Sequence, residues 1–245
     1  MDREVYDRLD QLEDRHWWFS ARRTILERVI RENALKGSRI KILEAGCGTG
    51  GNLEMLRSLG DLVAFEPDDD ARKLAASKSD CEIRHGTLPD GNPYKDQKFD
   101  LIVAFDVIEH VEQDEESLAA LRQSLAPGGK LIMTVPALPW MWSAHDERHH
   151  HFRRYTRDGL AETVKRAGYQ AVELTYFNTL LFPLIAGVRM VKKLFGMSQA
   201  EDDAMPPAPV NAILRGVFAA ERFLIGRIPL PIGVSLVAVL ESPGE

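Results

Sequence analysis

Short apolar runs alternate along the chain with segments in which apolar side chains recur every three to four positions. The runs predict buried strands at residues 40–43, 62–65, 81–84, 99–105, 130–135, 172–176 and 234–240. The periodic segments predict helices at residues 52–59, 69–77, 117–125 and 158–167. Strands that alternate with helices form a mostly parallel sheet with helices on both faces. The pattern therefore predicts an α/β fold in three layers.

The segment between the last two predicted strands is too long for a hairpin loop. It consists of an apolar part with a basic end at 180–195, an acidic and proline-rich part at 198–209, and a helix-compatible part at 212–228. The middle part has the composition of a mobile linker. We interpret residues 177–231 as a helical insertion.

The apolar part of this insertion has two interpretations. In the first, it is a lid or a subunit contact. A homodimer is therefore one of the possibilities. In the second, it lies on a membrane surface, which would make the protein membrane-peripheral. That interpretation places Leu180, Leu181, Phe182, Leu184 and Ile185 in lipid and turns Arg189, Lys192 and Lys193 toward anionic headgroups. Pro183 and Gly187 weaken a continuous helix, so the pattern favours packing.

Length and composition limit the class of protein. A chain of 245 residues with 44% hydrophobic content can bury one sizeable core. We therefore divide a single domain into N-terminal cap helices at 1–35, a core at 36–176, the insertion or lid at 177–231, and a last strand at 232–245. The net charge of −6 argues against a nucleic-acid partner. Two cysteines, no apolar signal core and no run of about 20 apolar residues predict a cytoplasmic protein.

A glycine-rich turn follows the first predicted strand. Gly46, Gly48 and Gly50 alternate there, and glycine lets a ligand approach the backbone amides without meeting a β-carbon. Glu66 closes the next strand, where a carboxylate can accept hydrogen bonds from both hydroxyls of a ribose. Together these features indicate a nucleoside cofactor. The alternating spacing disfavours NAD, although Gly51 would complete the longer dinucleotide pattern.

Four segments, in order, resemble motifs of the class I S-adenosylmethionine-dependent methyltransferases. They are the glycine turn at 43–50, the acidic segment at 65–68, the strand and its end at 99–111, and the turn into the next strand at 125–131. The resemblance implies a Rossmann-like αβα sheet of seven strands whose last strand is antiparallel. It also implies S-adenosylmethionine as the cofactor, with S-adenosylhomocysteine as the product.

The resemblance assigns roles to individual residues. Glu44 and the turn amides would hold the amino-acid end of the cofactor, and Glu66 its ribose. Thr87 would lie beside the adenine, and Asp106 beside the sulfonium. The full set implied for the cofactor is Trp18, Arg22, Glu44, Gly46, Cys47, Gly48, Gly50, Asn52, Glu66, Pro67, Thr87, Leu88, Asp106, Val107 and His110.

Two further motifs resemble one bacterial branch of these methyltransferases. The first is His16-Trp17-Trp18-Phe19 followed by Arg22-Arg23, which looks like a cap over the cofactor pocket. The second runs from Asp146 to His151-x-Arg153-Arg154-Tyr155 and looks like a substrate-side element. Members of this branch occur near glycan and lipid biosynthesis functions, so the implied acceptor is a small molecule or a lipid- or glycan-linked one.

The segment that leaves the fifth predicted strand is the expected wall of the acceptor site, because ligands lie beyond the carboxyl ends of parallel strands. Methyl transfer to an O–H or N–H nucleophile needs alignment of the partners and removal of a proton, which suits histidine near neutral pH. We therefore predict O-methylation with His151, Asp146 and His145 as catalytic residues. Trp142, His149, Arg154 and Tyr155 are the predicted substrate contacts.

Three alternatives stay open. His145, Asp146 and His149 fit no standard metal site, so we predict no metal, although some quinone-related members of the superfamily place one beside the sequence that Glu109-His110 matches. A nicotinamide-dependent oxidoreductase would use a similar ribose clamp. A non-catalytic cofactor-binding module would keep the pocket without the chemistry.

Overall fold

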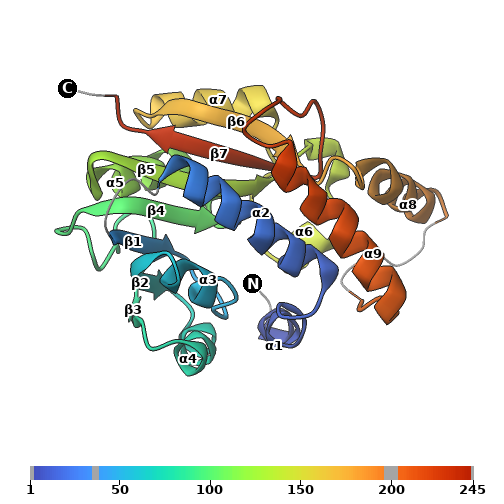
Figure 1. Cartoon of the computed structure of the whole chain (residues 1–245), viewed down its shortest axis with the longest axis horizontal. Coiled ribbons are helices and arrows are strands. Elements are labelled where there is room, and N and C mark those ends of the chain that lie inside the picture. The colour runs from blue at the N-terminus through green and yellow to red at the C-terminus, as the bar shows by residue number, and fades with distance from the viewer. Residues whose placement is uncertain (1–2, 35–38, 196–203, 244–245) are drawn as a thin grey trace.

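A seven-stranded sheet forms the centre of the protein in a computed structural model, which describes residues 3–34, 39–195 and 204–243 (Figure 1). The strand order is β3-β2-β1-β4-β5-β7-β6. Only β7 runs antiparallel to its neighbours β5 and β6, which confirms the predicted α/β sheet with an antiparallel last strand. The strands are β1 (Ile40–Ala45), β2 (Gly60–Glu66), β3 (Glu82–His85), β4 (Phe99–Phe105), β5 (Leu125–Pro136), β6 (Gln170–Phe177) and β7 (Ser235–Glu241).

The central strands are apolar because helices cover both of their faces. In β4 every residue is buried except Asp100, whose carboxylate accepts a hydrogen bond from the Lys41 amide of β1 at 2.8 Å. Six of the seven residues of β7 are buried in the same way. These continuous runs place the hydrophobic core along β1, β4, β5 and β7.

Helices form the outer layers of the fold. The helix α2 packs against α9, and both cross the front of the sheet in Figure 1, while α5 packs against α7 on the other face. The α-helices are α1 (Arg3–Leu12), α2 (Trp17–Asn33), α3 (Leu53–Arg57), α4 (Asp69–Lys78), α5 (Asp114–Gln123), α6 (Ala144–Arg148), α7 (Arg157–Arg166), α8 (Phe182–Leu194) and α9 (Ala208–Ala219). Three single turns of 3₁₀-helix are η1 (Ile108–His110), η2 (Pro139–Met141) and η3 (Ala220–Phe223).

The predicted elements agree with the observed ones to within three residues at each end, except at the start of β5. The helix after the glycine turn is limited to α3, and β5 begins at Leu125 instead of residue 130. The residues Pro127-Gly128-Gly129 were expected to form a turn before the strand. They lie within β5, with Gly128 at φ +75°. Glycine tolerates this left-handed conformation, so the chain can turn at Gly128 within β5.

The described part of the insertion forms two α-helices, and a proline lies in the first turn of each. Pro183 lies in the first turn of α8, where a helix needs no amide donor, so the predicted weakening of this helix is wrong. Pro209 lies in the first turn of α9, and the linker predicted at 198–209 is therefore wrong from Ala208 onward. Residues 196–203 of that linker lie outside the described residues. Among the helices that the structure describes, none is both long and apolar enough to cross a membrane.

Candidate functional site

A cavity of about 1230 Å³ extends across the carboxyl ends of the parallel strands. Residues that follow β1, β2, β4, β5 and β6 line its floor, and α1, α2 and α8 line its sides. Its volume exceeds the range of roughly 300–1,000 Å³ that is usual for small-molecule pockets. The cavity therefore has room for two ligands side by side.

The glycine turn forms one end of this cavity. Gly46, Gly48 and Gly50 have φ of +72°, +53° and +92°, a region that side chains other than glycine rarely adopt. The amides of Gly46 and Cys47 donate to the Phe65 carbonyl at 2.9 and 3.1 Å, which fixes the turn on β2. No atom lies within 4 Å of the place that a Gly48 β-carbon would occupy. The turn thus leaves an open cradle at Gly48.

Glu66 closes β2 beside this cradle, as predicted. Its side chain is buried, and its two carboxylate oxygens accept hydrogen bonds from the amides of Gly48 at 2.8 Å and Asp68 at 3.1 Å. Burial raises the pKa of Glu66, and the two amide donors oppose that shift. The carboxylate lines the cavity, and the two amides fix its oxygens in place. A fixed carboxylate is suited to accept hydrogen bonds from two neighbouring hydroxyls.

Glu44, by contrast, lies beneath the turn and outside the cavity lining. Its Oε1 accepts a hydrogen bond from Asn52 Nδ2 at 3.1 Å, whereas its buried Oε2 has no partner. Burial raises the pKa of this carboxyl to about 8. Of this pair, the structure places Asn52 in the cavity and Glu44 behind it.

We expect Glu44→Gln to raise thermal stability relative to the parent protein at about pH 9 and to leave it nearly unchanged at about pH 5. The folded pKa lies above the unfolded value, so the contribution of the neutral carboxyl is complete below the unfolded pKa and is lost as the pH rises through about 8. Glutamine stays neutral throughout. Thermal unfolding at both pH values measures the difference, with Glu54→Gln on the exposed side of α3 as the matched control. A difference independent of pH would contradict the assignment.

The cap residues of α2 reach the same cavity. Arg22 is buried, and its Nη2 lies 2.7 Å from Asp106 Oδ2 and 2.7 Å from Thr134 Oγ1. The guanidinium also lies over the ring of Trp18, 4.9 Å from its centroid. Asp106 follows β4 with φ +55°, a strained position for a residue other than glycine. Arg22 therefore connects α2 to the end of β4.

Most of the other residues predicted to contact the cofactor also line the cavity. Thr87 closes a short turn with Gly91 through two backbone hydrogen bonds, which places it and Leu88 at the end of β3. Gly50 lies just outside the lining and packs against α4, since a β-carbon there would lie 2.9 Å from Ala75 Cα. The predicted residues in the lining are Trp18, Arg22, Gly46, Cys47, Gly48, Asn52, Glu66, Pro67, Thr87, Leu88, Asp106, Val107 and His110.

A buried network holds His151 in the wall of the cavity. Asp146 is fully buried, and its Oδ1 lies 2.9 Å from His151 Nδ1 and 2.7 Å from Arg154 Nε. Its other oxygen accepts from the Ser143 amide at 2.9 Å and so begins α6. Burial opposes ionisation of Asp146, but the hydrogen bond of His151 and the charge of Arg154 outweigh it and hold the pKa of Asp146 well below its usual range. His151 is thereby fixed through Nδ1, which leaves Nε2 as its second nitrogen.

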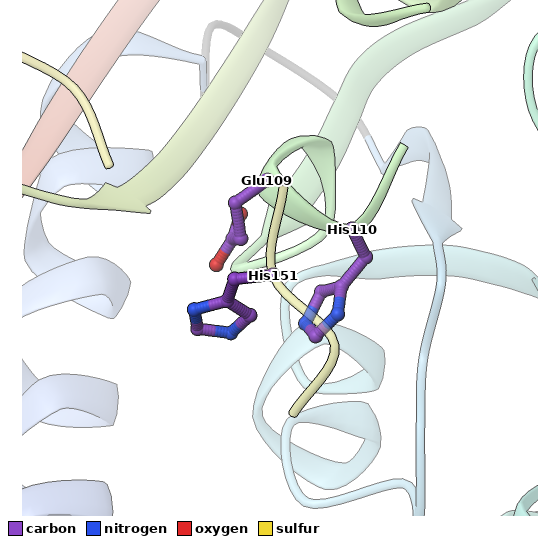
Figure 2. Close-up of side chains that lie close together, drawn as sticks. All are labelled: Glu109, His110 and His151. Carbon is purple, nitrogen blue, oxygen red and sulfur yellow. The ribbon is translucent and has the colours of Figure 1, made fainter. Parts of the chain in front are cut away.

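Glu109, His110 and His151 lie close together, and Figure 2 shows their side chains grouped where η1 meets the segment that carries His151. One ligand atom from each lies within 4.8 Å of the others, an arrangement that could hold a metal ion. Glu109 is fully buried, and neither of its carboxylate oxygens has a partner. Burial and Asp106 raise its pKa, while burial and His151 lower the pKa of His110 to about 3. The absence of a metal stays a prediction.

The residues predicted for catalysis and for substrate contact separate into two groups, apart from Asp146, which is buried outside the cavity lining and holds His151. His145, His149, His151 and Arg154 line the cavity, with the rings of His145 and His149 stacked at 4.0 Å. Trp142 and Tyr155 do not line it. The Tyr155 hydroxyl donates to Asp114 on α5 at 2.8 Å, and its backbone pairs with Ala137, so this side chain is buried in the core. The structure therefore gives no support to the predicted substrate contacts of Trp142 and Tyr155 in this cavity.

Several lining residues had no signal in the sequence pattern. Tyr6 of α1 lines the cavity, and so does Glu13, which accepts from Thr49 Oγ1 at 2.8 Å and from Lys78. Asn178 follows β6 with φ +56°, is 1% exposed, and has no partner for either amide atom. An asparagine at a strand end is often only a turn residue, so its place in the cavity was visible only in the fold.

Comparison with known proteins agrees with this geometry. The family model described as a methyltransferase domain matches residues 17–174. A Mycolicibacterium smegmatis protein named "Probable S-adenosylmethionine-dependent methyltransferase" is 26% identical over 163 residues, which cover 65% of this chain and 62% of that protein. The ubiquinone biosynthesis O-methyltransferase of Bartonella quintana is 34% identical over 110 residues, which cover 43% of this chain and 44% of that enzyme. The chain thus spans less than two thirds of these relatives.

Solved structures share the fold. The methyltransferase component of the complex with the Haloferax volcanii Trm112 methyltransferase activator superposes with a TM-score of 0.63 at 17% identity, over 99% of this chain and 96% of its own. Phosphoethanolamine N-methyltransferase 2 of Haemonchus contortus, in complex with S-adenosylmethionine, gives a TM-score of 0.56 at 12% identity, over 88% and 51%. Because the family model covers more than half of the sequence, the chain belongs to the S-adenosylmethionine-dependent methyltransferases.

Proposed function

We propose that the protein transfers the methyl group of S-adenosylmethionine to a hydroxyl oxygen of a small-molecule or lipid- or glycan-linked acceptor. The observation that carries this proposal is a single cavity lined both by a buried carboxylate beside a glycine turn and by a histidine that a buried aspartate holds. Glu66 and the glycine turn supply the first, and His151 with Asp146 the second.

The residues present fit the cofactor. The open cradle at Gly48 would accept its amino-acid end, together with the turn amides and Asn52. Glu66 would bind its ribose, and Thr87 and Leu88 would lie beside its adenine. When bound, the cofactor supplies an electrophilic methyl group on a sulfonium, which Asp106 and Val107 would flank.

His151 would act on the acceptor. Asp146 holds Nδ1 of the ring, so Nε2 is free to accept the hydroxyl proton as the oxygen attacks the methyl carbon in line with the sulfur. The fixed negative charge of Asp146 would stabilise the imidazolium that forms. Arg154 keeps Asp146 ionised and also donates to the Ala137 carbonyl at 3.1 Å, which holds the pair against β5. This arrangement suits a nucleophile that must lose a proton, as an O–H group does.

Two experiments test the proposal. Isothermal titration should show binding of both S-adenosylmethionine and S-adenosylhomocysteine, and no heat with either would contradict it. Incubation with methyl-labelled cofactor and a panel of quinols, phenols, sugars and lipid-linked acceptors should label one class. The match to a methyltransferase domain argues against the nicotinamide alternative. Labelling of an acceptor would exclude the non-catalytic one.

We expect Gly48→Ala to weaken S-adenosylmethionine binding about tenfold with a loss of roughly 1 kcal/mol in folding stability. Its β-carbon meets no protein atom but occupies the cradle that the cofactor needs. Gly128→Ala is the matched control, because Gly128 has a similar φ of +75° and equally open surroundings but lies in the strand β5, outside the cavity. It should lower stability similarly and leave binding unchanged. Equal effects of both variants on binding would show that the loss is strain alone.

A further inference from the structure

One side of α8 carries a row of exposed apolar side chains. Leu184, Val188, Val191 and Phe195, which directly follows the helix, recur every three to four positions and are 56%, 47%, 50% and 76% exposed. Such spacing places them along one stripe of a helix. Single exposed apolar residues are common on proteins, but a continuous stripe marks a surface that something else covers.

The helix α9 repeats this arrangement. Val210, Ile213 and Val217 have helical spacing and are 45%, 65% and 36% exposed. Leu184 and Val188 of the α8 stripe also line the cavity, and so does Leu214, which lies next to Ile213 on α9. Both helices therefore border the cavity.

The charged residues of α8 and α9 are all basic. Neither α8 nor α9 contains an aspartate or glutamate, although the whole chain has a net charge of −6. The helices carry basic residues instead, among them Arg189 and Lys192 on α8 and Arg215 on α9. A basic, apolar helix face complements an anionic lipid surface, whose headgroups attract the cations while the apolar side chains enter the acyl boundary.

Two exposed tryptophans lie next to α8. Trp140 is 52% exposed and packs edge-on against Phe182, and Trp142 is 38% exposed. Arg189 ties this turn to α8, since its Nη1 donates to the Met141 carbonyl at 3.1 Å. Tryptophan prefers the boundary between water and lipid, where one part of the ring system is apolar and the indole N–H stays wet.

We infer that α8, α9 and the Trp140–Trp142 turn form a docking surface for an anionic phospholipid bilayer, called here the lipid face. On such a surface the cavity mouth opens toward the lipid, and an acceptor with an apolar chain reaches His151 without crossing water. The acceptor class rests on the proposed methyl transfer, whereas the docking does not. The acidic run Glu201 to Asp203 follows α8 in the sequence and lies outside the described residues.

Cosedimentation with vesicles tests the inference without any acceptor. We expect the protein to pellet with vesicles of phosphatidylcholine and one-third phosphatidylglycerol, and much less with phosphatidylcholine alone or in high salt. The combined variant Val191→Ser, Phe195→Ser and Ile213→Ser should weaken that binding at least about tenfold. Arg215→Glu should weaken it through charge alone. None of these four residues lines the cavity.

Val172→Ser is the matched control, because Val172 is 48% exposed at the far end of β6, away from the cavity. Titration of each variant with S-adenosylmethionine reports separately on the proposed function. Cofactor binding without vesicle binding would overturn the inference and leave the proposed function standing. Vesicle binding without cofactor binding would overturn the proposed function and leave the inference standing. An equal loss in Val172→Ser would also overturn it. So would a concentration-dependent dimer that the triple variant dissociates, since the lipid face would then bind a second copy.

Discussion

Glu66→Ala is expected to weaken S-adenosylmethionine binding about 100-fold or more, because two hydrogen bonds to a charged acceptor are lost, at a net cost of roughly 3 kcal/mol. The carboxylate is buried in the cavity wall, and its oxygens are fixed by the amides of Gly48 and Asp68. A ribose that replaces water at these oxygens gains bonds whose geometry is already set. Isothermal titration of the purified variant measures the loss.

Controls separate the loss of ribose binding from a loosened turn. Glu66→Gln keeps one acceptor oxygen and the shape of the side chain, so it should bind with intermediate affinity. Asp69→Ala removes an exposed carboxylate three residues away and should bind normally. Thermal unfolding shows whether the glycine turn survives when Gly48 loses its partner. Normal binding by a folded Glu66→Ala would exclude the ribose role.

The cofactor half of the site could be predicted from the sequence because its chemistry is local. A glycine turn after one strand and a carboxylate at the end of the next must meet at the same edge of a parallel sheet. Gly46, Gly48 and Glu66 therefore lie where their spacing placed them. The antiparallel last strand was also predicted, but only through the resemblance, since an apolar run has no direction.

The acceptor half could not be predicted to the same extent, because it depends on contacts between distant segments. Arg154 and Tyr155 are adjacent in the motif, and both were predicted to contact the substrate. In an extended backbone, however, successive side chains point to opposite sides. Arg154 turns to Asp146, and Tyr155 turns to Asp114. The group formed by Glu109 and His151 likewise joins residues more than 40 positions apart. Nothing in the local pattern around Asn178 indicated that it lines the cavity.

His151→Ala is expected to lower kcat by about 100- to 10,000-fold, the usual contribution of a positioned general base, while S-adenosylmethionine binds as before. The acceptor is the one found by the labelling screen. Cofactor affinity should persist because the change leaves Glu66 and the glycine turn intact. Added imidazole should restore part of the turnover of His151→Ala, since the deleted ring leaves space for a base in solution. His85→Ala is the matched control, because His85 is an exposed histidine outside the cavity and should leave kcat unchanged.

Asp146→Asn separates positioning from structure in the same assay. It keeps the size of the side chain but removes the charge that fixes His151, so kcat should fall while KM changes little, and imidazole should not rescue a ring that is still present. Arg154 would lose its charged partner in the buried network, so thermal unfolding must accompany this variant. Full turnover in both His151→Ala and Asp146→Asn would mean that the acceptor reaches the methyl group already ionised, or loses its proton to another group in the cavity. Glu109, buried and without a hydrogen-bond partner beside His151, would then be the first to replace.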